Sequence, residues 1–114
     1  MSQPEQAFRI VPPNPEEVAR QGTIDRYNKF LIEESVPKFT KFIAEEKHKE
    51  FPTYRIQYRI KTVQLSFEEI EKMPGYKILK SLAELHNAKC ETVLVNENEK
   101  EVIDILITFP AKGQ

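Results

Sequence analysis

The chain has 114 residues, of which 39% are hydrophobic and 31% charged, and its formal net charge is −1 at pH 7. This composition argues against a wholly disordered chain and predicts a single domain, long enough to bury a core without a metal or a disulfide. A charge so close to zero also argues against simple polyelectrolyte binding.

The longest apolar runs, such as residues 105–107, are far shorter than the roughly 20 residues that cross a bilayer. No membrane span is therefore expected. The first residues show neither the basic start nor the apolar core of a signal peptide. Cys90 is the only cysteine, so no internal disulfide can form and nothing indicates an oxidising compartment. We expect an intracellular protein, most simply a cytoplasmic one, with the nucleus left open.

Both ends of the chain, residues 1–6 and 111–114, have the composition of flexible tails, and the domain is expected over residues 7–110. Residues 7–11 have strand-like composition and are a candidate edge strand. A helix should begin after Asn14, which predicts an N-cap, with Pro15 at the first helical position.

Pro37 predicts an interruption of this first helix, because it lacks an amide proton and clashes with the preceding turn. The helix is expected to end or kink near Glu34, and Ser35 is the predicted cap of a second helical segment. The apolar side of that segment includes Phe39 and Phe42.

Residues 54–61 alternate apolar and polar side chains, which is the pattern of a strand with one buried face, and the strand is expected over residues 54–64. After this strand, Ser66 and Glu69 have the spacing of a capping box and predict the start of a helix. A break or turn is expected at Pro74, and Asn87 is the predicted left-handed terminator of the helix that resumes there.

The remainder predicts a β-hairpin with strands at residues 91–95 and 101–109 and a polar loop at residues 96–100. One face of its second strand is apolar and should lie in the core: Ile103, Ile105, Ile107 and Phe109. The element order is then (β)-α-α-β-α-β-β. We predict an α+β fold, a two-layer sandwich with the helices packed on one face of a small, mainly antiparallel sheet.

The sequence offers no convincing catalytic or metal site. Nucleophilic catalysis needs a base that a third group orients, and Cys90, His48 and His86 form no such pattern. His86 and Cys90 are four residues apart but supply only two of the four ligands that structural zinc requires. The three glycines are isolated, so no phosphate-binding loop is present. We expect neither an enzyme nor a bound cofactor or metal.

One group of polar residues is a candidate binding surface, formed by the polar side of the strand at residues 54–61 and two nearby lysines: Arg55, Gln57, Arg59, Lys61, Lys47 and Lys49. Such a row can follow phosphates or acidic side chains. The alternative is an ordinary solvated sheet face. Tyr54 and Tyr58 should point to the opposite side, which argues against stacking of nucleic-acid bases on this surface.

The last strand carries apolar residues on both faces, because Val102 and Leu106 lie opposite the predicted core face. We interpret this pair as a self-association surface. The leading hypothesis is accordingly a small non-enzymatic protein-interaction module whose partner is another protein chain, including a second copy of itself. The alternative hypothesis is a nucleic-acid-binding domain that uses the basic face of the strand at residues 54–61.

Overall fold

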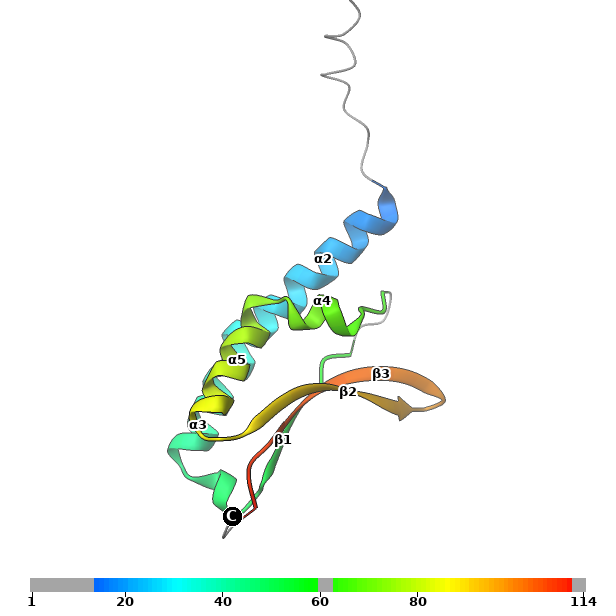
Figure 1. The fold of residues 1–114 in the computed structure, drawn as a ribbon. Helices are drawn as coiled ribbons and strands as arrows, with labels where there is room; N and C mark the ends of the chain where they lie inside the picture. The colour runs from blue at the N-terminus through cyan, green and yellow to red at the C-terminus, as the bar shows by residue number, and fades with distance from the viewer. Residues whose placement is uncertain (1–13, 60–62, 112–114) are drawn as a thin grey trace, which may run out of the picture.

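The computed structural model describes residues 14–59 and 63–111. The predicted tail at residues 1–6, the candidate strand at residues 7–11 and most of the predicted C-terminal tail lie outside these ranges. Within them the predicted fold class is confirmed: helices cover one side of an antiparallel sheet with strand order β1-β3-β2 (Figure 1). No helix in the described part of the chain is both long and apolar enough to cross a membrane.

The first helical layer begins with α2 (Pro15–Phe30) and continues through the π-helical turn η1 (Leu31–Ser35) into α3 (Val36–Ala44). The predicted cap at Asn14 is confirmed, because its side chain accepts a hydrogen bond of 2.8 Å from the Glu16 amide. The predicted cap at Ser35 is wrong, since Ser35 has helical dihedral angles and makes no capping hydrogen bond. Instead, the wider π turn just before Pro37 accommodates the missing amide proton without ending the helix.

After the short 3₁₀ segment η2 (Lys47–Lys49) the chain enters β1 (Thr53–Ile56). This strand is shorter than the predicted strand over residues 54–64, because residues 57–59 leave regular structure. The next helix, α4 (Phe67–Glu71), starts with the predicted capping box: the Ser66 amide donates to the Glu69 carboxylate, and the Glu69 amide donates to the Ser66 hydroxyl.

Helix α5 (Pro74–Leu85) begins at the predicted break. The predicted left-handed terminator, Asn87, is confirmed: it follows the C-cap His86 and has a φ of 59°. The amide of Ala88 donates to the carbonyl of Ala83, which completes a Schellman motif. The start of α5 lies against the first helical layer at Gly75. A Cβ atom there would lie 2.6 Å from Cβ of Leu31, so only glycine permits this close approach.

The C-terminal hairpin consists of β2 (Lys89–Glu97) and β3 (Lys100–Thr108). Its loop contains only Asn98 and Glu99, both with positive φ, as in a type I′ turn. The predicted loop over residues 96–100 is therefore too long, because the pairing of β2 with β3 extends to the turn. In Figure 1 the far end of this hairpin projects beyond the helices.

The central strand β3 supplies the sheet's share of the core. Its predicted core face is confirmed: Ile103, Ile105, Ile107 and Phe109 are at most 9% exposed. Aromatic side chains join the helices to β1 and the segment after it, where Tyr58 stacks on Tyr27 and Tyr54 packs on Phe42, with ring centroids 4.6 and 4.8 Å apart. Both tyrosines thus face the helices, as predicted.

Candidate interaction surface

The register of the sheet defines its outer face, the side away from the helices. Residues paired across neighbouring strands share a face, so the outer face can be read in rows. From the β1 end toward the hairpin turn, the rows are Arg55, Leu106 and Glu91; Asp104 and Val93; Val102 and Val95; and Lys100 and Glu97.

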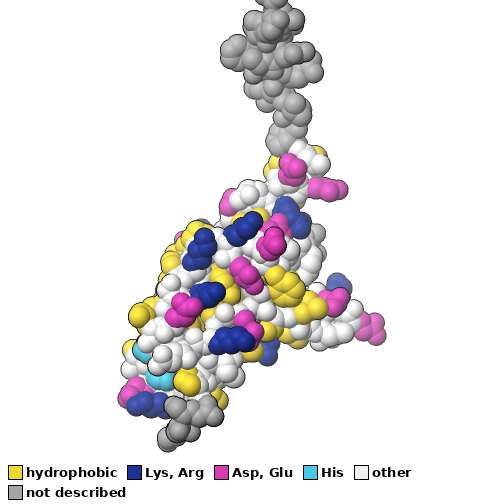
Figure 2. All heavy atoms as spheres, viewed as in Figure 1, with side chains coloured by type: hydrophobic (Ala, Val, Ile, Leu, Met, Phe, Trp, Pro, Cys, Tyr) yellow, Lys and Arg dark blue, Asp and Glu magenta, His cyan; other side chains and the backbone are white. Residues whose placement is uncertain are grey.

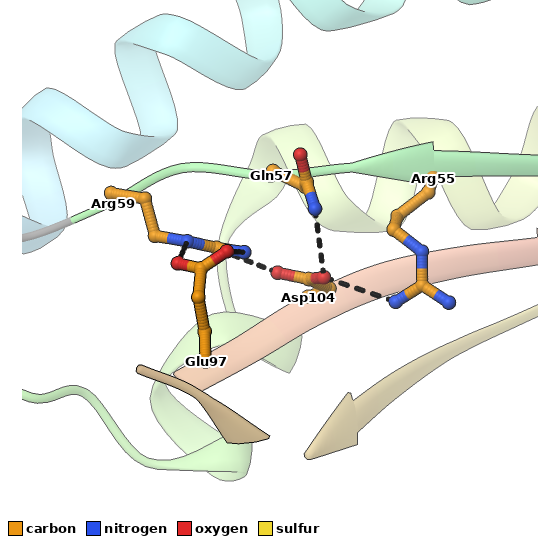
Figure 3. Close-up of polar contacts among 5 residues, drawn as sticks. All are labelled: Arg55, Gln57, Arg59, Glu97 and Asp104. Carbon is orange, nitrogen blue, oxygen red and sulfur yellow. Dashed lines mark hydrogen bonds and ion pairs between the residues drawn. The ribbon is translucent and has the colours of Figure 1, made fainter. Parts of the chain in front are cut away.

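Asp104 organises the polar part of this face and is fully buried beneath its own partners. Arg59 Nη1 donates to Asp104 Oδ1 at 2.6 Å, and Arg55 Nη1 donates to Oδ2 at 3.0 Å (Figure 3). Gln57 Nε2 lies 3.5 Å from the same Oδ2. Arg59 also binds Glu97 through two bonds, Nε to Oε2 at 2.7 Å and Nη2 to Oε1 at 3.2 Å. Two arginines and two carboxylates therefore form one neutral network.

The network keeps both of its carboxylates charged. Burial alone would raise the pKa of Asp104, but the hydrogen bonds from Arg59 and Arg55 outweigh burial and hold this pKa below its ordinary value. The hydrogen bond from Arg59 likewise lowers the pKa of Glu97. The same two carboxylates raise the pKa of Arg59 still further, so its guanidinium stays charged.

The structure brings together three of the six predicted binding residues, because Arg55, Gln57 and Arg59 all reach Asp104. It places the two lysines elsewhere, at the two ends of η2, where Lys47 pairs with Glu45 at 3.2 Å and Lys49 pairs with Glu46. The sixth, Lys61, lies outside the described residues. Each predicted cation in the described ranges thus already has a carboxylate partner within this chain.

The predicted self-association pair, Val102 and Leu106, lies on the outer face and is partly exposed. The structure adds two residues that sequence reasoning had not singled out, Val93 and Val95 on β2, also partly exposed. Val95 is the cross-strand partner of Val102. Only the pairing of the strands could show that these four apolar side chains share a face, because the pattern of β2 alone does not say which side is covered.

The edge of the sheet at β2 is a second feature that sequence reasoning missed. In an antiparallel sheet, the main-chain N–H and C=O groups of successive residues point to opposite sides of the strand. A central strand therefore bonds to one neighbour through its odd-numbered residues and to the other through its even-numbered residues, or the reverse. The Phe109 amide donates to the Pro52 carbonyl at 2.7 Å, which assigns the odd-numbered residues of β3 to the β1 side. The even-numbered residues of β3 then bond to odd-numbered residues of β2. The main-chain groups of Thr92, Leu94 and Asn96 consequently point away from the sheet.

A side-chain contact agrees with this assignment. The Tyr76 hydroxyl donates to the Cys90 carbonyl at 3.3 Å, so this even-numbered carbonyl of β2 is reached from α5. Beyond Cys90 no hydrogen bond to the outward-pointing groups of β2 is found within the described residues. Leu94 is 51% exposed on this edge.

Known protections against edge pairing are missing from the middle of β2. Such edges are usually short, bulged, or broken by proline or an inward-pointing charge. In β2 the pairing with β3 runs without a bulge over all nine residues, and residues 92–96 carry no charge and no proline. By contrast, the opposite outer strand, β1, has only four residues and carries Arg55. We call the outward-facing groups of Thr92, Leu94 and Asn96 the open edge.

The candidate residues for other chemistry lie apart from this surface. Cys90 is buried, and burial raises the pKa of its thiol to about 11, which disfavours the nucleophilic thiolate. The rings of His48 and His86 lie 6.0 Å apart, with Phe109 stacked on His48. In the described part of the chain no three metal-ligating side chains of His, Cys, Asp or Glu come together.

Comparison of this chain with protein-family models, with curated proteins and with solved structures finds no match.

Proposed function

We propose that this protein is a small non-enzymatic interaction module that binds another protein chain by adding a strand to the open edge of β2. The observation that carries the proposal is a nine-residue outer strand without a bulge, whose central outward-pointing main-chain groups have no hydrogen-bond partner among residues 14–59 and 63–111. In this mode of recognition, main-chain hydrogen bonds supply affinity and the alternating side chains supply specificity.

The side chains beside the open edge fit such a partner. Val93 and Val95 face outward next to it, and Val102 and Leu106 extend the apolar surface onto β3. A strand added at β2 would cover part of this surface and remove it from water. The neutral network around Asp104 adds no net charge that would favour an ionic ligand over a polypeptide.

The nucleic-acid alternative finds less support. Its described cations are already bound: Arg55 and Arg59 to Asp104, Lys47 to Glu45, and Lys49 to Glu46. A phosphate would have to compete with these carboxylates. On the face shown in Figure 2, basic and acidic side chains are interspersed, without the continuous basic stripe that marks a nucleic-acid surface.

We place this module inside the cell, most simply in the cytoplasm. The support is chemical: the single cysteine is a free, buried thiol in a strand, the ordinary state of cysteine in a reducing compartment.

Site-specific photo-crosslinking in the protein's native cells tests the proposal. A photoreactive amino acid would replace Leu94 on the open edge or, as a matched control, Leu85, which is 76% exposed at the end of α5. The expected result is one defined protein adduct from position 94 that is absent from position 85. Nucleic-acid adducts at position 94, or no adduct that distinguishes the two positions, would contradict the proposal.

A further inference from the structure

Two of the three charges of β2 stand at equal distances from its middle residue, Val93. Lys89 stands four residues before Val93 and Glu97 stands four residues after it. The third charge, Glu91, lies beside Lys89, and residues 92–96 are uncharged. A strand with opposite charges at equal distances from its centre is complementary to an antiparallel copy of itself.

The hydrogen-bonding pattern restricts how two such strands can pair. The outward-pointing main-chain groups of β2 belong to even-numbered residues. In an antiparallel ladder between two copies, even-numbered residues must therefore stand opposite even-numbered residues, and odd-numbered residues opposite odd-numbered ones. Three registers use the open edge most fully, with the two-fold axis at Thr92, Val93 or Leu94.

The charges select one of these three registers. With the axis at Leu94, Glu91 would face Glu97 of the second copy, and like charges directly opposite are destabilising. With the axis at Thr92, Lys89 would face Val95 and find no charged partner. With the axis at Val93, Lys89 faces Glu97 of the second copy at both ends of the ladder, which is a favourable cross-strand pair. This pair adds to the contacts within each chain, where Lys89 lies 3.5 Å from Glu91 and Glu97 binds Arg59. Glu91 then faces Val95, so no like charges are opposed.

We propose that the strand added to the open edge is β2 of a second copy of this chain, antiparallel and centred on Val93. This inference rests on the proposed function and names its partner. Thr92 and Leu94 then exchange main-chain hydrogen bonds across the two-fold axis. Farther out, Asn96 faces Cys90 of the second copy, whose carbonyl also accepts from Tyr76. The two sheets join into one, and the outer-face valines of both copies form a continuous apolar strip.

A cysteine cross-link measures this register directly. Val93 would form a non-hydrogen-bonded pair with its own copy, with Cα atoms about 4.5 Å apart, which is within the range of a disulfide. Val95 would lie four residues out of register with its copy, about 13 Å away along the strand. Val93→Cys should therefore form a covalent dimer under mild oxidation, whereas the matched control Val95→Cys should not. Native Cys90 is buried and should not contribute.

A second variant tests the edge itself. The amide of Leu94 points away from β3, and proline is tolerated on the open side of an outer strand. Leu94→Pro should remove the dimer in light scattering while cooperative unfolding remains; its control is Leu85→Gln, which should leave the dimer intact. Should Leu94→Pro fail to fold, the two cysteine variants still decide.

Each outcome has a distinct meaning. A wild-type dimer with a cross-link at position 93 and none at position 95 is the expected result. Equal cross-linking at both positions, no cross-link in a wild-type dimer, or a folded Leu94→Pro dimer would overturn the inference. A wild-type protein that stays monomeric at high concentration would also overturn it. If the wild-type protein is monomeric but position 94 forms a photo-adduct with a different protein, the proposed function is supported and only the self-pairing is contradicted. If no such adduct forms, both the proposed function and the self-pairing are contradicted.

Discussion

The guanidinium of Arg59 lies 2.6 Å from the carboxylate of Asp104, although the two residues are 45 positions apart in the sequence. This contact converts a row of cations that suggested a binding surface into part of a neutral network. Asp104 is fully buried, whereas the Arg59 side chain is 31% exposed, so the arginine both neutralises the acid and covers it.

We expect Asp104→Asn to destabilise the protein by about 1–3 kcal/mol, because hydrogen bonds to a charged partner become weaker ones. The pH dependence should change as well. The pKa of Asp104 is lowered in the folded state. The contribution of the ionised carboxylate to the free energy of unfolding is therefore complete above the ordinary pKa of about 3.9 and is lost as the pH falls through the folded-state pKa. Urea unfolding from pH 7 to pH 3 should therefore show a shallower acid loss in the variant.

The control for this series is Asp25→Asn, an exposed aspartate on α2, which should change stability by no more than about 0.5 kcal/mol. Equal effects of the two substitutions would show that the network around Asp104 contributes nothing specific.

Ser66→Ala should lower the free energy of unfolding by about 1 kcal/mol, because α4 loses its cap and the Glu69 amide loses its acceptor. Ser81→Ala offers a matched control, since Ser81 is exposed within α5 and alanine is the better helix former there. Denaturant midpoints of the two variants should move in opposite directions. A midpoint unchanged by Ser66→Ala would contradict the role of the capping box.

Neighbouring residues on β3 allow a test of the strand's register. Ile105 is fully buried on the helix side, so Ile105→Ala should cost about 2–5 kcal/mol. Leu106 is partly exposed on the outer face, and Leu106→Ala should cost clearly less. The comparison is made by urea unfolding, and a larger loss at Leu106 would show that the two faces have been assigned in reverse.

Leu106→Glu separates two ways in which copies of this chain can associate. Pairing through β2 leaves Leu106 one strand away from the added strand, so we expect the dimer to persist in light scattering. If the outer faces of two sheets instead pack on each other, Val102 and Leu106 would be buried between them. A charge there would be costly, and a folded monomer would result. That outcome would favour face-to-face association over edge pairing.

Binding to mixed-sequence nucleic acid should be weak at physiological salt, because the four candidate cations that the structure describes are already paired with carboxylates: Arg55, Arg59, Lys47 and Lys49. Fluorescence anisotropy at low and high salt would measure it, with Lys47→Gln combined with Lys49→Gln as the variant. Reversing Arg55 and Arg59 is a poor test, since it would set new carboxylates beside buried Asp104. Tight, steeply salt-dependent binding that the lysine variant weakens would restore the nucleic-acid hypothesis.

The sequence by itself determined the features that depend on neighbouring residues. The capping box at Ser66, the left-handed end at Asn87 and the apolar face of β3 could all be predicted, because caps and alternation act over a few positions. The α+β class followed from the order of these elements. The cap expected at Ser35 was wrong because the hydrogen bond that Pro37 cannot make is compatible with either a new helix or a π turn, and the local pattern does not decide between them.

Only the tertiary structure decided what the sheet presents to its surroundings. Whether Arg59 is free or paired depends on Asp104, and whether β2 is covered depends on β3 taking the centre of the sheet. Both features depend on contacts between segments far apart in the chain. These contacts form when the helices and strands pack so that their apolar faces are buried together. Local pattern does not encode strand order, so the open edge could be found only once the strands were placed side by side.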